Sequence, residues 1–153
     1  MRSNRFWQRL SGAAVALLIS SGVWAATPTP DGIMTFTPLN LTTGSGAKLE
    51  KAVITYQGKM YDMRINGLGV GGAMVSGVKV TAEVYGLKTL SALEDTYVVD
   101  LADSTESAQD EISSDDLWLY GTHGVRIRMY TSTPGITIAA GGDEVAVLLG
   151  RAD

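Results

Sequence analysis

Hydrophobic and polar residues alternate most regularly over positions 59–66 and 78–85. The hydrophobic positions of the first segment are Tyr61, Met63 and Ile65. A period of two places successive side chains on opposite faces of a strand. Both segments are therefore predicted to be half-buried antiparallel strands, joined through the glycine-rich stretch 67–72.

Short segments with a similar pattern recur along the rest of the chain. We predict further strands at positions 32–39, 49–56, 96–101, 117–120, 125–130, 136–140 and 144–149. Gln57-Gly58 and three later glycine-containing stretches, 121–124, 133–135 and 141–143, carry turn residues. The strand at 32–39 is expected at a sheet edge, because Pro38 cannot donate a ladder hydrogen bond.

One short helix is predicted between Lys88 and Glu94. Ser91 and Glu94 have the spacing of a capping box. The acidic stretch 103–116 is expected to be a surface loop or a frayed helix, and the last third of the chain is expected to run as a meander. The fold class is therefore all-β, a small antiparallel sandwich or barrel of about 7–9 short strands with one short helix near 88–94.

The first 25 residues are predicted to be a signal peptide and not part of the fold. Three arginines precede a short apolar run at 13–19, and Val23 and Ala25 give small residues before a cleavage site after Ala25. The apolar run is too short for a spanning helix. No cysteine is present, so a lipoprotein is excluded. We divide the chain into a signal peptide (1–25), an extended segment with the weak edge strand (26–48) and a β-domain (49–150).

The charge of the processed chain limits its partners. Removal of Arg2, Arg5 and Arg9 leaves nine basic and 16 acidic residues, a net charge of −7. Such a protein is a poor candidate for binding nucleic acids or anionic lipids, because it repels their phosphates. The absence of cysteine means that the fold uses no disulfides, which fits a periplasmic or secreted protein stabilised by its core.

The glycine-rich stretch is the one candidate contact site. Its residues are Gly67, Leu68, Gly69, Val70, Gly71 and Gly72. A dinucleotide-binding loop requires a following helix, and here a strand follows. The favoured interpretation is a bend or bulge that lets backbones approach closely. The functional alternative is contact between the Gly67–Val78 region and something apolar, such as a membrane or lipid.

The acidic segment 94–116 is the only candidate for cation binding. It contains nine carboxylates and no lysine or arginine. A solvated charge run is the favoured interpretation, and weak Ca²⁺ binding is the alternative. No other cofactor or metal site is predicted.

Catalysis is not expected. His123 is the only histidine and lies in a predicted turn, so a multi-histidine zinc site is excluded. No G-x-S-x-G nucleophile elbow occurs. The acidic pairs Glu94-Asp95 and Asp115-Asp116 are common features of polar loops and do not define an acid–base site.

Tyr85 and Tyr130 fall on the polar faces of their predicted strands, beside Glu83 and Arg128. Exposed tyrosines on a sheet can bind a sugar or a peptide. We favour the simpler interpretation that they are cross-strand partners of neighbouring side chains.

The stretches GLGVGG and VKVTAEVYGL resemble SYLF-type lipid-associated domains in their loose pattern of glycine and aliphatic residues. The resemblance implies an association with lipid and assigns no residue a role. The function expected from the sequence is that of an exported, non-catalytic envelope β-domain with a binding or structural role, with a membrane or a protein as its partner. The alternative is a domain that binds a lipid or another apolar ligand. An open interior lined by Met63, Ile65, Val80 and Val84 would favour a ligand, and a filled interior a scaffold.

Overall fold

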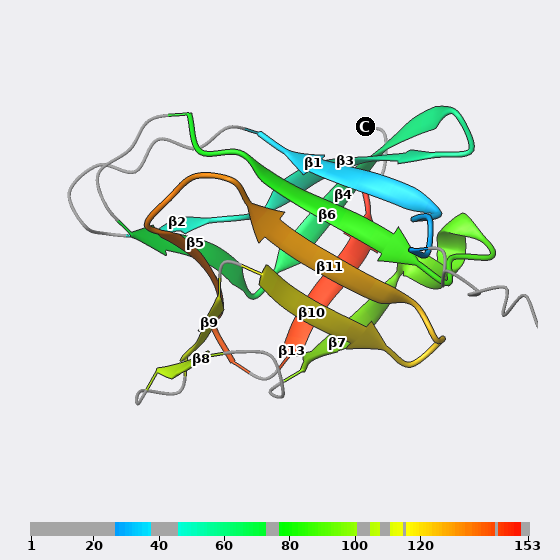
Figure 1. Ribbon diagram of the computed structural model, residues 1–153. Helices are drawn as coiled ribbons and strands as arrows, with labels where there is room; N and C mark the ends of the chain where they lie inside the picture. Colours follow the sequence, from blue (N-terminus) through cyan, green and yellow to red (C-terminus); the bar gives the residue numbers. More distant parts are fainter. Residues whose placement is uncertain are drawn as a thin grey trace, which may run out of the picture.

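The computed structural model describes residues 27–37, 46–72, 77–100, 105–107, 111–114, 116–142 and 144–150. These residues form a closed β-barrel that continues at one end into a second, smaller sheet (Figure 1). The fold is all-β, and of the two architectures expected from the sequence it is the barrel. The predicted signal peptide lies outside the described residues.

Eight antiparallel strands close the barrel. In their order around it they are β1 (Gly32–Phe36), β3 (Lys51–Tyr56), β4 (Lys59–Asn66), β13 (Glu144–Leu149), β7 (Asp95–Val99), β10 (Asp116–Gly121), β11 (Arg126–Thr131) and β6 (Val80–Tyr85). Strand β1 pairs with β3 on one side and β6 on the other. The prediction that it is an edge strand is therefore wrong: Gly32 to Phe36 can pair on both sides because Pro38 follows the strand instead of interrupting it.

The inward-facing side chains fill the barrel. Met63 and Ile65 are each 1% exposed, as the alternation along β4 predicts, and Val80 and Val84 face them with 2% and 0%. All four belong to one contiguous cluster of buried residues. Eight strands enclose a space just wide enough for side chains to fill it, so the interior is a packed core, the outcome that favours a scaffold over a ligand inside the barrel.

The second sheet has five short strands. Their order is β2 (Ala47–Lys48), β5 (Leu68–Gly72), β12 (Ile136–Ala140), β9 (Glu111–Ser114) and β8 (Thr105–Ser107). Two predictions are corrected by this sheet. The stretch 68–72, expected to be a bend, is itself a strand, and parts of the expected loop 103–116 pair as strands β8 and β9. With these additions the described residues contain 13 strands, more than the expected 7–9.

A bent two-stranded ribbon joins the sheets. Strand β4 leads directly into β5, and β12 leads into β13. The ribbon pairs β5 with β12 in the second sheet and β4 with β13 in the barrel. The predicted meander is therefore wrong beyond the β10–β11 hairpin: β12 and β13 are not paired with each other, because β12 belongs to the second sheet and β13 to the barrel.

The predicted short helix is a single 3₁₀ turn, η1 (Leu90–Leu93). The residue before it is Thr89, and its side chain makes no capping hydrogen bond. The capping box expected at Ser91 and Glu94 is absent from this turn, since Glu94 follows the helix and its carboxylate instead accepts from the backbone N–H of Leu149 at 2.9 Å. Buried Leu93 anchors the turn against the barrel.

Candidate functional site

The sharp bend at the start of the glycine-rich stretch is made by Gly67. Its φ of +97° is unfavourable for residues with a side chain. A Cβ atom here would also lie 2.8 Å from the carbonyl oxygen of Glu144. Across the bend, the Gly141 N–H donates to the Gly67 carbonyl at 2.9 Å. Gly67 therefore brings the two halves of the ribbon into close backbone contact.

The apolar side chains of this stretch face the core. Leu68 is 5% exposed and Val70 is 2% exposed. A partner that contacts the outer surface of the stretch 67–72 would therefore meet glycine backbone more than apolar side chains. The four residues that follow, 73–76, belong to the predicted apolar-contact region but lie outside the described residues.

A pocket of about 420 Å³ lies over the bend. Three of the six candidate residues, Gly67, Leu68 and Gly69, line it, and Ala139 and Gly141 contribute from the neighbouring part of the ribbon. The absence of side chains on the glycines leaves this surface hollow. The sequence thus identified one wall of the pocket, while the wall from 139–141 depends on the pairing of β5 with β12.

Two further pockets continue from the first along β3. One of about 250 Å³ shares Lys48 and Glu50 with the pocket over the bend. The other, of about 530 Å³, shares Lys51 with the smaller one and extends over β1 and β4. We call these three adjoining pockets the outer groove.

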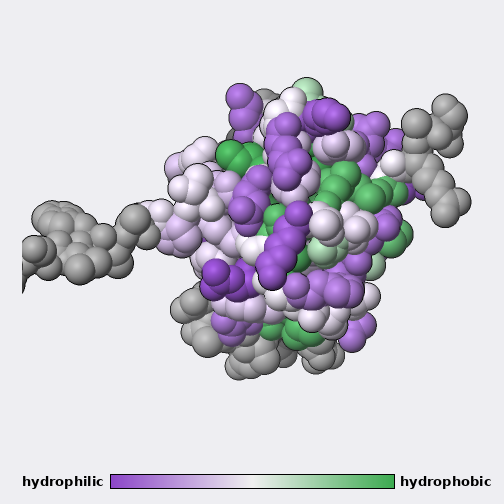
Figure 2. All heavy atoms as spheres, turned by 90° about the vertical axis from the view of Figure 1, so that its right-hand side faces the viewer, coloured by the Kyte–Doolittle hydropathy of each residue, from purple (hydrophilic) through white to green (hydrophobic). Residues whose placement is uncertain are grey.

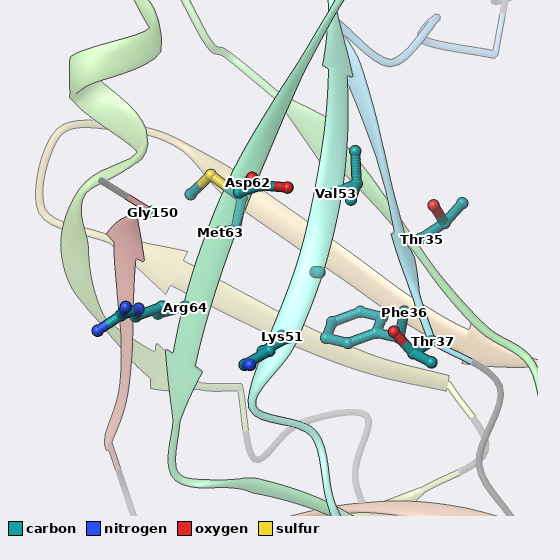
Figure 3. A pocket seen from close by; sticks show the side chains of 10 residues that line it. Thr35, Phe36, Thr37, Lys51, Val53, Asp62, Met63, Arg64 and Gly150 are labelled. Carbon is teal, nitrogen blue, oxygen red and sulfur yellow. The ribbon is translucent and has the colours of Figure 1, made fainter. Parts of the chain in front are cut away.

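The outer groove carries more basic than acidic side chains. Its basic residues are Lys48, Lys51 and Arg64, and its acidic residues are Glu50 and Asp62. Figure 3 shows the largest of these three pockets, in which the Lys51 side chain leans toward β4 and the Arg64 side chain extends from β4 away from Lys51. Thr35 and Thr37 form the opposite side. A net positive groove on an acidic chain was not predicted.

The position of these basic residues could have been found from the hairpin turn. Gln57 and Gly58 both have positive φ, as a two-residue hairpin turn requires. The turn pairs Tyr56 with Lys59, and counting outward from it places Lys51 opposite Arg64. Both residues occupy outward-facing positions of their strands. The hairpin register was the missing information that places them opposite each other.

A second group of side chains lies on the opposite part of the barrel wall. We call it the aromatic–arginine cluster, and its members are Glu83, Tyr85, Asp116, Trp118, Tyr120, Arg128 and Tyr130. The strand register aligns Glu83, Arg128 and Trp118 in one row across β6, β11 and β10. Tyr85 stacks on Trp118 with ring centroids 5.9 Å apart.

Arg128 holds this cluster together. Its Nε and Nη2 donate to the Asp116 carboxylate at 3.0 and 2.6 Å, and Nη1 lies 3.8 Å from Glu83. The guanidinium carbon lies 5.9 Å from the centre of the Trp118 ring and 5.5 Å from that of Tyr130. Hydrogen bonding to Asp116 raises the pKa of Arg128, so the cation is maintained.

The two tyrosines that the sequence singled out are tied to Glu83. The Tyr85 hydroxyl donates to Glu83 at 2.7 Å, and the Tyr130 hydroxyl donates at 3.4 Å. The hydrogen bond to Glu83, followed by burial, raises the pKa of Tyr85. Burial, followed by the charge of Glu83, raises the pKa of Tyr130. These contacts agree with the interpretation as cross-strand partners, although Tyr85 is only 7% exposed and its stacking on Trp118 was not foreseen.

His123 lies in the β10–β11 turn, where Asp95 fixes it. The Asp95 carboxylate lies 3.0 Å from the imidazole Nδ1 and accepts from the Thr122 N–H at 2.7 Å and the Thr122 hydroxyl at 2.8 Å. The Thr122 hydroxyl is also 3.4 Å from the same Nδ1. A catalytic triad places the acid and the nucleophile on different ring nitrogens. This arrangement holds a turn and does not form a proton relay.

The residues that the structure describes contain no group of three or more histidine, cysteine or acidic side chains that could hold a metal ion. Much of the acidic segment 94–116 lies outside them. Weak Ca²⁺ binding by that segment therefore stays a prediction.

Large apolar side chains are exposed on the barrel, and two of them, Val98 on β7 and Tyr120 on β10, lie directly opposite each other. Ile33, Met60, Val98, Tyr120 and Leu148 come from five different strands. Figure 2 shows the barrel end with the β3–β4 and β10–β11 turns, where hydrophobic and hydrophilic residues are interspersed. Within the described parts of the chain, no helix has the length and hydrophobicity needed to cross a membrane.

Comparison with known proteins gives no relative: no family model, no curated protein and no solved structure matches the chain.

Proposed function

We propose that the processed chain is an exported, non-catalytic binding domain of the periplasm or cell envelope, with its ligand in the outer groove. The observation that carries the proposal is the contrast between the filled interior of the barrel and the hollows on its outer surface. Core side chains occupy the barrel interior, whereas adjoining hollows run over β1, β3 and β4 to the Gly67 bend. Concave surfaces with a few converging polar groups are where small ligands bind.

A substitution that fills the groove tests this function. At Gly141 a Cβ atom would meet nothing within 4 Å, so Gly141→Phe places a ring at the pocket over the bend without a backbone clash. Gly71→Phe is the matched control, because Gly71 lies on the same ribbon, lines none of the three pockets, and has space for a Cβ atom.

The measurement is native mass spectrometry of protein gently purified from the periplasmic fraction. We expect a mass beginning at Ala26, with a bound small molecule in the wild type and in Gly71→Phe and with its loss in Gly141→Phe. Bare protein in all three samples would count against groove binding and favour a structural role. A chain retaining residues 1–25 in the cytoplasm would overturn the proposal of export.

The apolar-ligand alternative draws its support from the pocket over the bend, since Ile65, Leu68 and Ala139 line it beside the glycines. Its probe is the uncharged fluorophore N-phenyl-1-naphthylamine. If the alternative holds, fluorescence rises with the wild type and with Gly71→Phe and is reduced by Gly141→Phe. The absence of any rise with the wild type would exclude this alternative.

A further inference from the structure

We propose that Lys51 and Arg64 form an oxyanion-binding point in the outer groove, which recognises a phosphate-type group of the ligand. This inference rests on the proposed groove function and specifies the chemistry of the ligand. It starts from the register of the β3–β4 hairpin, in which Lys51 lies directly opposite Arg64. Both belong to the outward-facing set of their strands and both are exposed.

Two like charges in directly opposed positions destabilise a sheet. Neither cation lies within 4.0 Å of a carboxylate in the described part of the chain. Asp62 lines the same pocket, but its cross-strand partner is Val53. The chain therefore keeps two cations side by side although acidic residues outnumber basic ones.

Arg128 on the opposite wall shows how this chain holds a structural cation. Asp116 engages it through two nitrogens, and Glu83 and two aromatic rings surround it. Among the residues that the structure describes, Lys51 and Arg64 have no comparable partners, and they line a pocket of about 530 Å³. Two cations at a hollow, without an ion pair to any described carboxylate, fit a counter-charge supplied by a ligand.

The two side chains suit an oxyanion in complementary ways. Guanidinium can bind two oxygens of a phosphate or carboxylate at once, and ammonium adds a mobile point charge. Directly opposed residues of an antiparallel pair have Cβ atoms about 5 Å apart. Both side chains are exposed and can change rotamer, which brings the two head groups within reach of one anion.

Inorganic phosphate or a phosphate monoester is preferred over a carboxylate because its second negative charge matches two cations, whereas the phosphodiester of a phosphatidylglycerol headgroup carries one charge. The acidic surroundings, with Glu50 and Asp62 in the groove, limit the affinity for a free ion. Binding should also weaken with ionic strength, since exposed charges are screened.

The experiment titrates the chain from Ala26 onward with inorganic phosphate, followed by NMR shifts of backbone amides on β3 and β4. The test variant is Lys51→Gln/Arg64→Gln. The control is Lys59→Gln/Arg126→Gln, which makes the same change in net charge at residues that line none of the three pockets. We expect the test variant to bind phosphate about tenfold more weakly, the scale of losing hydrogen bonds to a charged group, and the control to change less than twofold.

A second arm separates a free phosphate from a lipid headgroup. The same variants are sedimented with phosphatidylglycerol vesicles and, for comparison, phosphatidylcholine vesicles. Binding to phosphatidylglycerol that only the test variant loses identifies a lipid as the source. Binding to inorganic phosphate alone identifies a soluble ligand. Equal behaviour of test and control variants toward both probes, or no binding by the wild type to either, overturns the proposal.

Two further readouts separate this inference from the groove function and from a structural role. If native mass spectrometry shows a ligand that the test variant retains, the groove binds but the oxyanion point is wrong. Removal of one cation of a repelling pair should leave the melting temperature equal or higher. A clear fall in melting temperature for Lys51→Gln or Arg64→Gln would show a structural role instead and contradict the proposal.

Discussion

Asp95 is the side chain with the most concentrated set of hydrogen bonds in the described residues. Its side chain is only 9% exposed, and burial by itself would raise its pKa. Hydrogen bonds from the Thr122 side chain, the Thr96 backbone and the His123 side chain outweigh burial and lower the pKa from 3.8 to about 2. The ionised form is therefore part of the folded structure.

This shift predicts how Asp95→Asn affects stability at different pH values. A lowered pKa contributes stability that is present above pH 3.8 and is lost as the pH falls toward 2. We expect the variant to lose about 1–2 kcal/mol of unfolding free energy at pH 7, since the partners donate to a charged group. The difference should shrink steadily below pH 4.

Urea unfolding at pH 7, 4 and 2.5 measures this difference. Trp118 provides the signal, because it is the only tryptophan from Ala26 onward. Glu144→Gln serves as control, since Glu144 is exposed on β13. A deficit for Asp95→Asn that does not change with pH would contradict the assigned role of its charge.

At the scale of single elements, the bend at Gly67 divides one continuous chain segment between the two sheets. Before it, β4 belongs to the barrel, and after it β5 belongs to the second sheet. The alternation along 59–66 was sufficient to predict β4 and its buried face. The stretch 68–72 was not recognised as a strand, because three of its five residues are glycines and β-propensity reflects side-chain packing.

The bend yields a prediction for Gly67→Ala. The alanine must adopt a φ near +97° and place its Cβ atom 2.8 Å from the Glu144 carbonyl oxygen. We expect a loss of about 2–3 kcal/mol in unfolding free energy, because the strain adds to the clash. Gly141→Ala, at the other side of the same hydrogen bond, should change stability by less than about 0.5 kcal/mol.

Chemical denaturation of both variants and the wild type gives the comparison. Equal stability of Gly67→Ala and Gly141→Ala would show that the ribbon shifts freely at the bend and would remove the reason for a glycine there. A loss of stability in Gly67→Ala alone would show that the positive φ and close packing at Gly67 cause the loss.

For the whole molecule, the sequence indicated an all-β protein but could not choose between a sandwich and a barrel. Local alternation identifies strands and their buried faces, and a two-residue turn fixes the register of one hairpin. The pairings that close the barrel, β1 with β6 and β13 with both β4 and β7, join positions far apart in the chain. No local pattern specifies them. The Lys51–Arg64 pair in the groove, by contrast, follows from the register of one local hairpin.

Closure predicts that β1 is essential although it is short. It separates β3 from β6 and supplies Met34 and Phe36 to the core. A chain that begins at Thr37 would leave two unpaired edges and an open core, and exposed edges promote association. We expect it to aggregate, whereas a chain that begins at Thr29 should remain monomeric with an unchanged melting temperature.

Size-exclusion chromatography and circular dichroism distinguish the two truncated chains. A monomeric chain from Thr37 with the circular dichroism and melting temperature of the longer chain would show that the barrel does not need β1. Such a result would also show that the side of the outer groove formed by β1 is not needed for folding.

The position of β13 has a consequence for the time course of synthesis. It is the last barrel strand along the chain, yet it lies between β4 and β7 (Figure 1). The ring therefore keeps a gap until residues near 149 have been made, however early the other seven strands pair. A growing chain with this order of strands cannot complete its barrel on the ribosome while its C-terminal part is still missing. For the proposed export, this late closure would keep the barrel unclosed until synthesis is nearly complete.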